Sequence, residues 1–130
     1  MMGTVVLDSE GLSAIVNKDR WVMSQVTVAR QDGMRVMTSA ATLVEARDPK
    51  VNQARFDWAV SRLEVMPVTE DIARSASRLL AERGMHGHQH AIDAMLAATA
   101  IEAPGPRTVF TSDPKDMNKL CGKSVRVVGI

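Results

Sequence analysis

Two acidic residues follow apolar runs that are typical of β-strands. Asp8 comes directly after TVVL (4–7), and Asp113 comes two residues after TVFT (108–111). In an open parallel sheet, ligands bind outside the carboxyl ends of the strands, at the point where the strand order reverses. We therefore expect both acids at the same edge of one sheet, where carboxylates can hold a cation.

Two further acids lie on predicted helices near this edge. Glu45 is about two turns into the helix after the second strand, and Asp93 is in the first turn of the helix that precedes 108–111. Two carboxylates about 5 Å apart repel by roughly 3 kcal/mol at an effective dielectric constant of about 20. Four converging acids would need a proton or a cation to relieve this repulsion. An oxygen-only ligand set favours Mg²⁺ or Mn²⁺ over zinc.

Each acid also has a structural interpretation that needs no ligand. Asp8 and Asp113 are both suitable helix N-caps, and Pro114 suits the first position of the helix after Asp113. Asp93 can interact with a helix dipole, and Glu45 can be a solvated side chain on a helix face. Spacing alone leaves both interpretations open.

Length and composition are those of one globular domain, which we expect to cover residues 1–130. The chain is 45% hydrophobic and 24% charged, which excludes disordered and fibrous classes. It has no run of about 18 apolar residues, and its N-terminus lacks the basic region of a secretory signal, so we expect a cytoplasmic protein. The single cysteine, Cys121, excludes an intramolecular disulfide and is expected in the core. The net charge of +1 is weak, so attraction to nucleic acid would depend on local Lys and Arg side chains.

Short apolar runs alternate with amphipathic segments along the chain. Strands are predicted at 4–7, 34–38, 63–68, 108–111 and 124–130. Helices are predicted around 12–16, between 19 and 32, from 39 onward, and at 50–60, 69–84, 90–103 and 114–120. This alternation predicts an α/β fold with a mostly parallel five-stranded sheet between two layers of helices.

Four segments, in this order and spacing, resemble the PIN-domain ribonucleases, especially the short bacterial forms that act as VapC-type toxins. They are VVLDSEGLSAIV near the start, TSAATLVEAR after the second strand, HAIDAMLAATA in the long helix and VFTSDPKDM at the fourth strand. The resemblance implies a three-layer α/β/α PIN fold and a Mg²⁺- or Mn²⁺-dependent endoribonuclease that cleaves single-stranded or looped RNA with a metal-activated water. It also implies the toxin of a type II toxin–antitoxin pair, with a cognate antitoxin as partner and a homodimeric form.

The resemblance assigns roles to particular residues. The catalytic and metal-binding acids of the family match, in chain order, Asp8, Glu45, Asp93 and Asp113. Asp116 matches a further acid that many members carry, which we count as a metal ligand. Thr111 matches a hydroxyl position that would hold a water or a phosphate oxygen.

Basic and aromatic side chains supply fewer signals. Candidate phosphate contacts are Arg47, Lys50 and Arg20. The chain has only two Trp, two Phe and no Tyr, so stacking of unpaired bases has little support. Trp21 and Trp58 are instead expected in a core or a subunit interface.

Three other interpretations compete with a metal-dependent ribonuclease. Haloacid-dehalogenase phosphatases also place an Asp after the first strand, but their Asp-x-Asp motif is not met because residue 10 is Glu10. A PIN-like domain that only binds a protein or RNA is the non-catalytic alternative. Histidines at 86, 88 and 90 raise the possibility of zinc, but Gly84 and Gly87 predict a flexible loop there and no fourth ligand is evident.

Overall fold

A computed structural model describes residues 3–130, in which five strands form one parallel sheet. The strand order is β3-β2-β1-β4-β5, so β1 pairs with β2 on one side and with β4 on the other. The strands are β1 (Thr4–Leu7), β2 (Arg35–Ser39), β3 (Glu64–Met66), β4 (Arg107–Thr111) and β5 (Arg126–Gly129). The predicted five-stranded parallel sheet is confirmed.

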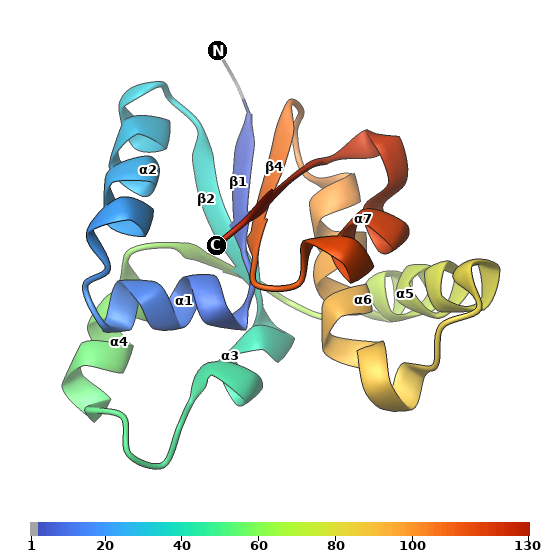
Figure 1. The fold of residues 1–130 in the computed structure, drawn as a ribbon, viewed down its shortest axis with the longest axis horizontal. Coiled ribbons are helices and arrows are strands. Elements are labelled where there is room, and N and C mark those ends of the chain that lie inside the picture. The colour runs from blue at the N-terminus through green and yellow to red at the C-terminus, as the bar shows by residue number, and fades with distance from the viewer. Residues whose placement is uncertain (1–2) are drawn as a thin grey trace.

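Helices cover both faces of the sheet in three layers (Figure 1). They are α1 (Ser9–Val16), α2 (Arg20–Gln31), α3 (Ala40–Ala46), α4 (Gln53–Ser61), α5 (Glu70–Arg83), α6 (Gly87–Glu102), α7 (Pro114–Cys121) and the short 3₁₀ helix η1 (Gly122–Ser124). Helices α1, α2 and α4 lie on one side, and α5, α6 and α7 lie on the other. The expected α/β/α sandwich is therefore confirmed. Within residues 3–130, no helix has the length and apolar character needed to cross a membrane.

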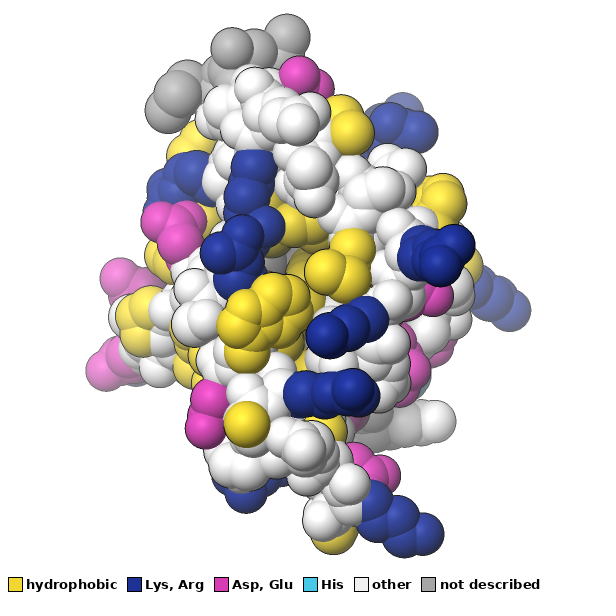
Figure 2. Space-filling model, turned by 90° about the vertical axis from the view of Figure 1, so that its left-hand side faces the viewer, with side chains coloured by type: hydrophobic (Ala, Val, Ile, Leu, Met, Phe, Trp, Pro, Cys, Tyr) yellow, Lys and Arg dark blue, Asp and Glu magenta, His cyan; other side chains and the backbone are white. Residues whose placement is uncertain are grey.

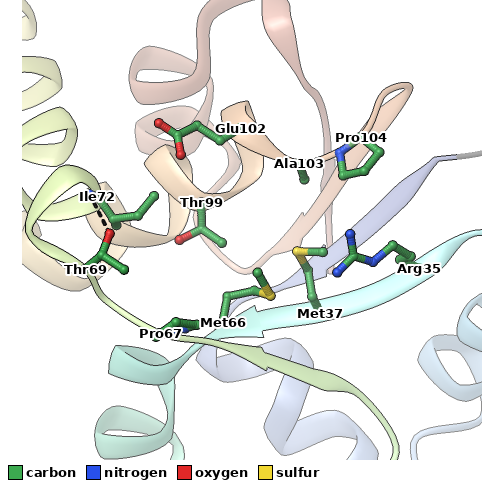
Figure 3. Close-up of a pocket in the computed structure, with 10 residues that line it drawn as sticks. All are labelled: Arg35, Met37, Met66, Pro67, Thr69, Ile72, Thr99, Glu102, Ala103 and Pro104. Atoms are coloured by element: carbon green, nitrogen blue, oxygen red, sulfur yellow. Dashed lines mark hydrogen bonds between the residues drawn. The ribbon is translucent and has the colours of Figure 1, made fainter.

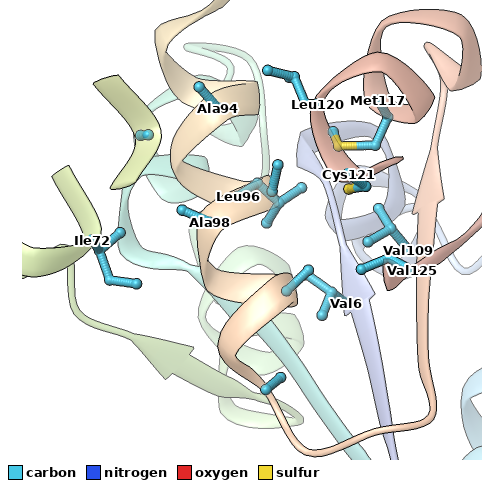
Figure 4. Close-up of a cluster of buried hydrophobic side chains, with 14 of the residues drawn as sticks. Val6, Ile72, Ala94, Leu96, Ala98, Val109, Met117, Leu120, Cys121 and Val125 are labelled. Atoms are coloured by element: carbon cyan, nitrogen blue, oxygen red, sulfur yellow. The ribbon is translucent and has the colours of Figure 1, made fainter. Parts of the chain in front are cut away.

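A hydrophobic core fills each side of the sheet, because successive side chains of a strand point to opposite faces. In β1, Val5 and Leu7 pack with α1, α2 and α4, whereas Val6 packs with α6 and α7. Figure 4 shows the second of these cores, which includes Val6 of β1, Leu96 of α6 and Leu120 of α7. Because both faces of the sheet are buried, the strand sequences are continuous apolar runs and do not alternate between apolar and polar residues.

Side-chain caps fix where several helices begin. The carboxylates of Asp8, Asp19 and Asp113 accept hydrogen bonds from backbone N–H groups in the first turns of α1, α2 and α7, and the Thr69 hydroxyl does the same for α5. The caps at Asp8 and Asp113 agree with the structural interpretation of these residues from the sequence. Because Asp8 and Asp113 are caps, their positions relative to the ends of β1 and β4 are set by backbone geometry.

The structure bears on four local predictions, which concern Trp21, Trp58, residues 87–90 and Cys121. Trp21 and Trp58 are 48% and 42% exposed, so they do not fill a core of this chain, and the alternative of a subunit interface stays a prediction. Residues 87–90 are not a loop, because α6 begins at Gly87 and only His90 has a non-helical conformation, which kinks the helix. Cys121 is confirmed in the core, where burial raises its pKa to about 12.

Candidate active site

Asp8 is held at the point where the strand order reverses. It follows β1, and β1 is flanked by β2 and by β4, which comes from the other half of the chain. Its Oδ1 accepts a hydrogen bond from the N–H of Gly11 at 2.8 Å, and its Oδ2 accepts one from the N–H of Ser112 at 3.1 Å. The carboxylate is 5% exposed. Asp8 therefore ties the start of α1 to the loop after β4.

Glu45 reaches the same edge from α3. Its helix follows β2, and its side chain is exposed. The Oγ of Ser9, the residue next to Asp8, donates a hydrogen bond of 2.5 Å to the Oε1 of Glu45. Ser9 was not among the residues that the sequence singled out, although its place directly after Asp8 was a signal that could have found it.

Asp93 is the acid of this group with a raised pKa. Its pKa is raised from 3.8 to about 6, first because the carboxyl is partly buried, and then by the charges of Glu45, Asp8 and Asp113, in that order. The charge of His90 opposes this rise. Asp93 is thus close enough to three other carboxylates to be influenced by their charges.

Asp113 lies in the turn between β4 and α7. Its Oδ1 accepts a hydrogen bond of 3.3 Å from the N–H of Asp116, and its own N–H donates to Oγ1 of Thr111 at 3.0 Å. Thr111 is fully buried, and its hydroxyl shapes this turn. Its role toward a phosphate oxygen or a water stays a prediction.

Asp116 turns toward a histidine instead of joining the charges that act on Asp93. Its Oδ2 lies 3.7 Å from Nδ1 of His90, which is within ion-pair distance when the imidazole is protonated. Both side chains are largely buried, at 25% and 17% exposure. His90 is also the residue at which α6 is kinked.

The four acids match the donor chemistry of a hard cation. All their donor atoms are carboxylate oxygens, which Mg²⁺ and Mn²⁺ prefer. Among residues 3–130, however, no group of three His, Cys, Asp or Glu side chains is already arranged to hold a metal ion. The charges of Glu45, Asp8 and Asp113 nevertheless all act on Asp93, so the four carboxylates lie near one another.

The basic candidates lie around this edge without contacting the acids. Arg47, at the end of α3, has its guanidinium 5.9 Å from the centre of the Phe56 ring. Lys50 lines a groove of about 320 Å³ formed by the end of α1 and the segment after α3. Arg20 is exposed at the first position of α2. Their role as phosphate contacts stays a prediction.

Asp93→Asn is expected to stabilise the metal-free protein at neutral pH. Because the folded-state pKa lies above 3.8, the native state binds this proton more tightly than the unfolded state, and that stabilisation is lost as the pH rises through about 6. Asn stays neutral, so the gain in free energy of unfolding is about 1–2 kcal/mol after allowance for solvent screening.

Urea denaturation in EDTA measures this gain at neutral pH and at a pH of about 4, where it should vanish. Asp32→Asn, at the exposed C-cap of α2, is the matched control. It should show no such pH-dependent gain. Equal behaviour of the two variants would mean that Asp93 is not in a crowded acidic site.

A second cavity does not have the character of a reaction site. It measures about 250 Å³ and lies between β2, β3 and the helices α5 and α6 (Figure 3). Its hydroxyls are already engaged, since Thr69 accepts from the N–H of Ile72 and Thr99 donates to the carbonyl of Met95. Arg35 at its margin pairs with Glu64 at 2.8 Å. The acidic edge is therefore the better candidate.

The flank formed by α2 and α4 is apolar and basic. Figure 2 shows hydrophobic side chains near the middle of this face, with Lys and Arg on either side. Trp58 and Val28 are 42% and 51% exposed there. Nη2 of Arg30 is buried with no hydrogen-bond partner among the described residues, and burial followed by the charge of Arg62 lowers the pKa of Arg30. Such a face is suited to contact with another molecule.

Comparison with known proteins agrees with this fold. One chain of the VapBC2 complex of Rickettsia felis bound to promoter DNA matches with a TM-score of 0.74 and 18% identity, covering 98% of both chains. The DNA-bound VapBC of Salmonella typhimurium gives 0.68 and 19%, covering 99% of this chain and 98% of that one. PAE2754 from Pyrobaculum aerophilum gives 0.62 and 17%, covering 98% and 92%.

Sequence comparison adds the family. The curated proteins contain no match to this chain. The family model described as the PIN domain matches residues 5–123, which is nearly the whole length. The chain therefore belongs to the PIN domain family.

Proposed function

We propose that this protein is a cytoplasmic, Mg²⁺- or Mn²⁺-dependent endoribonuclease that cleaves single-stranded or looped RNA. The observation that carries the proposal is the crowding of carboxylates around Asp93, whose pKa is raised to about 6 first by partial burial and then by the charges of Glu45, Asp8 and Asp113. PIN domains are generally nucleases, so family membership supports hydrolysis of a phosphodiester and weighs against the phosphatase alternative.

Each acid has a defined part in this proposal. Asp8 is fixed by two backbone N–H groups, so it presents its remaining lone pairs in a set direction. Glu45, Asp93 and Asp113 complete an oxygen ligand set, and Asp116 supports it from beside His90. When bound, Mg²⁺ or Mn²⁺ activates water and stabilises the charge that develops on the phosphate. Without it, the residues retain the repulsion that raises the pKa of Asp93.

Cleavage of a mixed RNA substrate with Mn²⁺, and its loss on addition of EDTA, is the direct test. Double-stranded DNA and a phosphomonoester serve as control substrates. Phosphatase activity alone, or no cleavage of RNA under either condition, would contradict the proposal. Binding of RNA without cleavage would favour a non-catalytic PIN domain.

Millimolar Mn²⁺ is expected to raise the melting temperature of the protein. The cation binds the native acids and has no comparable site in the unfolded chain, and a concentration of about 100 times the dissociation constant corresponds to roughly 2.7 kcal/mol of stabilisation. Differential scanning fluorimetry across a Mn²⁺ titration gives the shift. K⁺ at matched ionic strength separates binding at the acids from general screening. An unchanged melting temperature would argue against a metal site.

We also propose that the protein is the toxin of a toxin–antitoxin pair and forms a homodimer. The support is that two of the matched structures are described as VapBC complexes and a third as FitAB bound to a DNA fragment. The exposed Trp58 and Val28 on the α2–α4 flank offer an apolar surface for a protein partner. Growth arrest on induction, reversed by co-expression of the neighbouring open reading frame, tests this part separately from catalysis.

A further inference from the structure

Ser9 is a buried serine at the start of a helix. It is the first residue of α1, directly after Asp8, and it is only 9% exposed. Its Oγ donates to Oε1 of Glu45, which lies 36 residues further along the chain on α3. At 2.5 Å, this is the short hydrogen bond expected when a hydroxyl donates to a carboxylate.

Glu45 has little else to fix its side chain. Its helix, α3, has only seven residues, and Glu45 itself is exposed, beside Val44 at 78% exposure. A long, exposed acidic side chain samples several rotamers. Holding it in a single rotamer to bind a ligand therefore costs conformational entropy. The bond from Ser9 selects one orientation and leaves Oε2 free.

The bond to Glu45 also satisfies the buried hydroxyl of Ser9. A buried donor without an acceptor is destabilising, and Glu45 is the acceptor that the Ser9 hydroxyl has in this structure. The two residues therefore hold each other in place. Because Asp8 and Ser9 are adjacent, the start of α1 sets the position of one acid through its own backbone and of a second acid through a side chain.

We propose that Ser9 is a positioning residue that holds Glu45 in the orientation in which it contributes to divalent cation binding. This inference rests on the proposed function. Ser9 does not touch the ion or the substrate, and it acts through Glu45. Loss of such a supporting hydrogen bond typically weakens metal affinity by about 10–100-fold.

Binding of Mn²⁺ to the whole protein, measured from the loss of the EPR signal of the free ion, tests this without any assay of cleavage. Ser9→Ala should weaken the affinity by about tenfold or more, whereas Ser9→Thr, which keeps the hydroxyl, should stay within about threefold of the wild type. Ser13→Ala is the matched control, because it makes the same change one turn further along α1.

The dependence on Glu45 is tested by a double-mutant cycle. Glu45→Gln should weaken Mn²⁺ binding by itself, and adding Ser9→Ala to it should cause little further loss. If Ser9→Ala does not fold, Ser9→Cys takes its place, since the thiol is similar in shape but a weak donor. The EPR measurement and the melting temperature in EDTA then separate lost affinity from lost stability.

The outcomes distinguish this inference from the proposed function. Weak binding by Glu45→Gln with unchanged binding by Ser9→Ala would overturn the role of Ser9 and leave the metal site intact. Equal and additive losses in the double mutant would also overturn it, because Ser9 would then not act through Glu45. Absence of Mn²⁺ binding by the wild type would overturn the proposed function itself, and with it any positioning role.

Discussion

RNA cleavage by the Asp113→Asn variant is expected to fall by about 10³-fold, while the protein stays folded. Asn is as good an N-cap as Asp, so its side-chain oxygen can still accept the hydrogen bond from the N–H of Asp116 that begins α7. The substitution therefore removes a negative charge from the proposed site and keeps the cap. A loss of roughly 4 kcal/mol of transition-state stabilisation corresponds to this fall in rate.

Single-turnover cleavage of a labelled RNA in Mn²⁺ gives the rate, and thermal denaturation in EDTA checks the fold. Asp19→Asn is the matched control, because Asp19 caps α2 in the same way, with its carboxylate accepting from the N–H of Val22 at 3.0 Å. It lies outside the acid group and should cleave normally. Activity of Asp113→Asn within tenfold of the control would mean that Asp113 is only a cap.

Leu96→Ala is expected to lower the free energy of unfolding by about 3–4 kcal/mol. Leu96 is 1% exposed on α6, in the core that α6, α7 and the sheet share (Figure 4). Truncation removes buried apolar contacts and leaves a cavity that the packed neighbours cannot fill. Since a domain of this size is stable by only about 5–15 kcal/mol, the loss is a large part of the total.

Urea denaturation measures this effect against Leu79→Ala on α5, where the side chain is only partly buried and the loss should be smaller. The change also bears on the site, because Asp93 is on α6 one turn before Leu96. We expect the affinity for Mn²⁺ to fall in Leu96→Ala even under conditions where the variant is fully folded. A loss no larger than that of Leu79→Ala would mean that the core relaxes around the cavity.

The features that depend on short stretches of sequence could be predicted. The strands, the caps at Asp8 and Asp113, and the placement of both acids at one sheet edge follow from apolar runs and cap residues near them in the chain. The membership of the family followed from four ordered segments. These signals lie within short stretches of the chain or in the order of such stretches, so one sequence is enough to detect them.

The features that depend on tertiary contacts could not be predicted. The bond from the N–H of Ser112 to Asp8 joins residues 104 positions apart, and the bond from Ser9 to Glu45 joins two different helices. Burial of the Thr111 hydroxyl and the contact of Asp116 with His90 likewise depend on how α6 and α7 pack. The sequence left a core and a subunit interface open for Trp21 and Trp58, and only the packed structure shows that both are exposed on this chain.

The strand order also governs when the acidic edge can form during synthesis. β1 pairs with β4, whose residues leave the ribosome long after those of β1. At about 5–20 residues per second, the stretch from Asp8 to Asp113 takes roughly 5–20 seconds to translate. Once Glu45 has been made, the nascent chain carries Asp8, Ser9 and Glu45 for the rest of that interval without Asp113. A nuclease built on this edge would thus be silent on the ribosome that makes it, and would gain its activity only after β4 has emerged and joined the sheet.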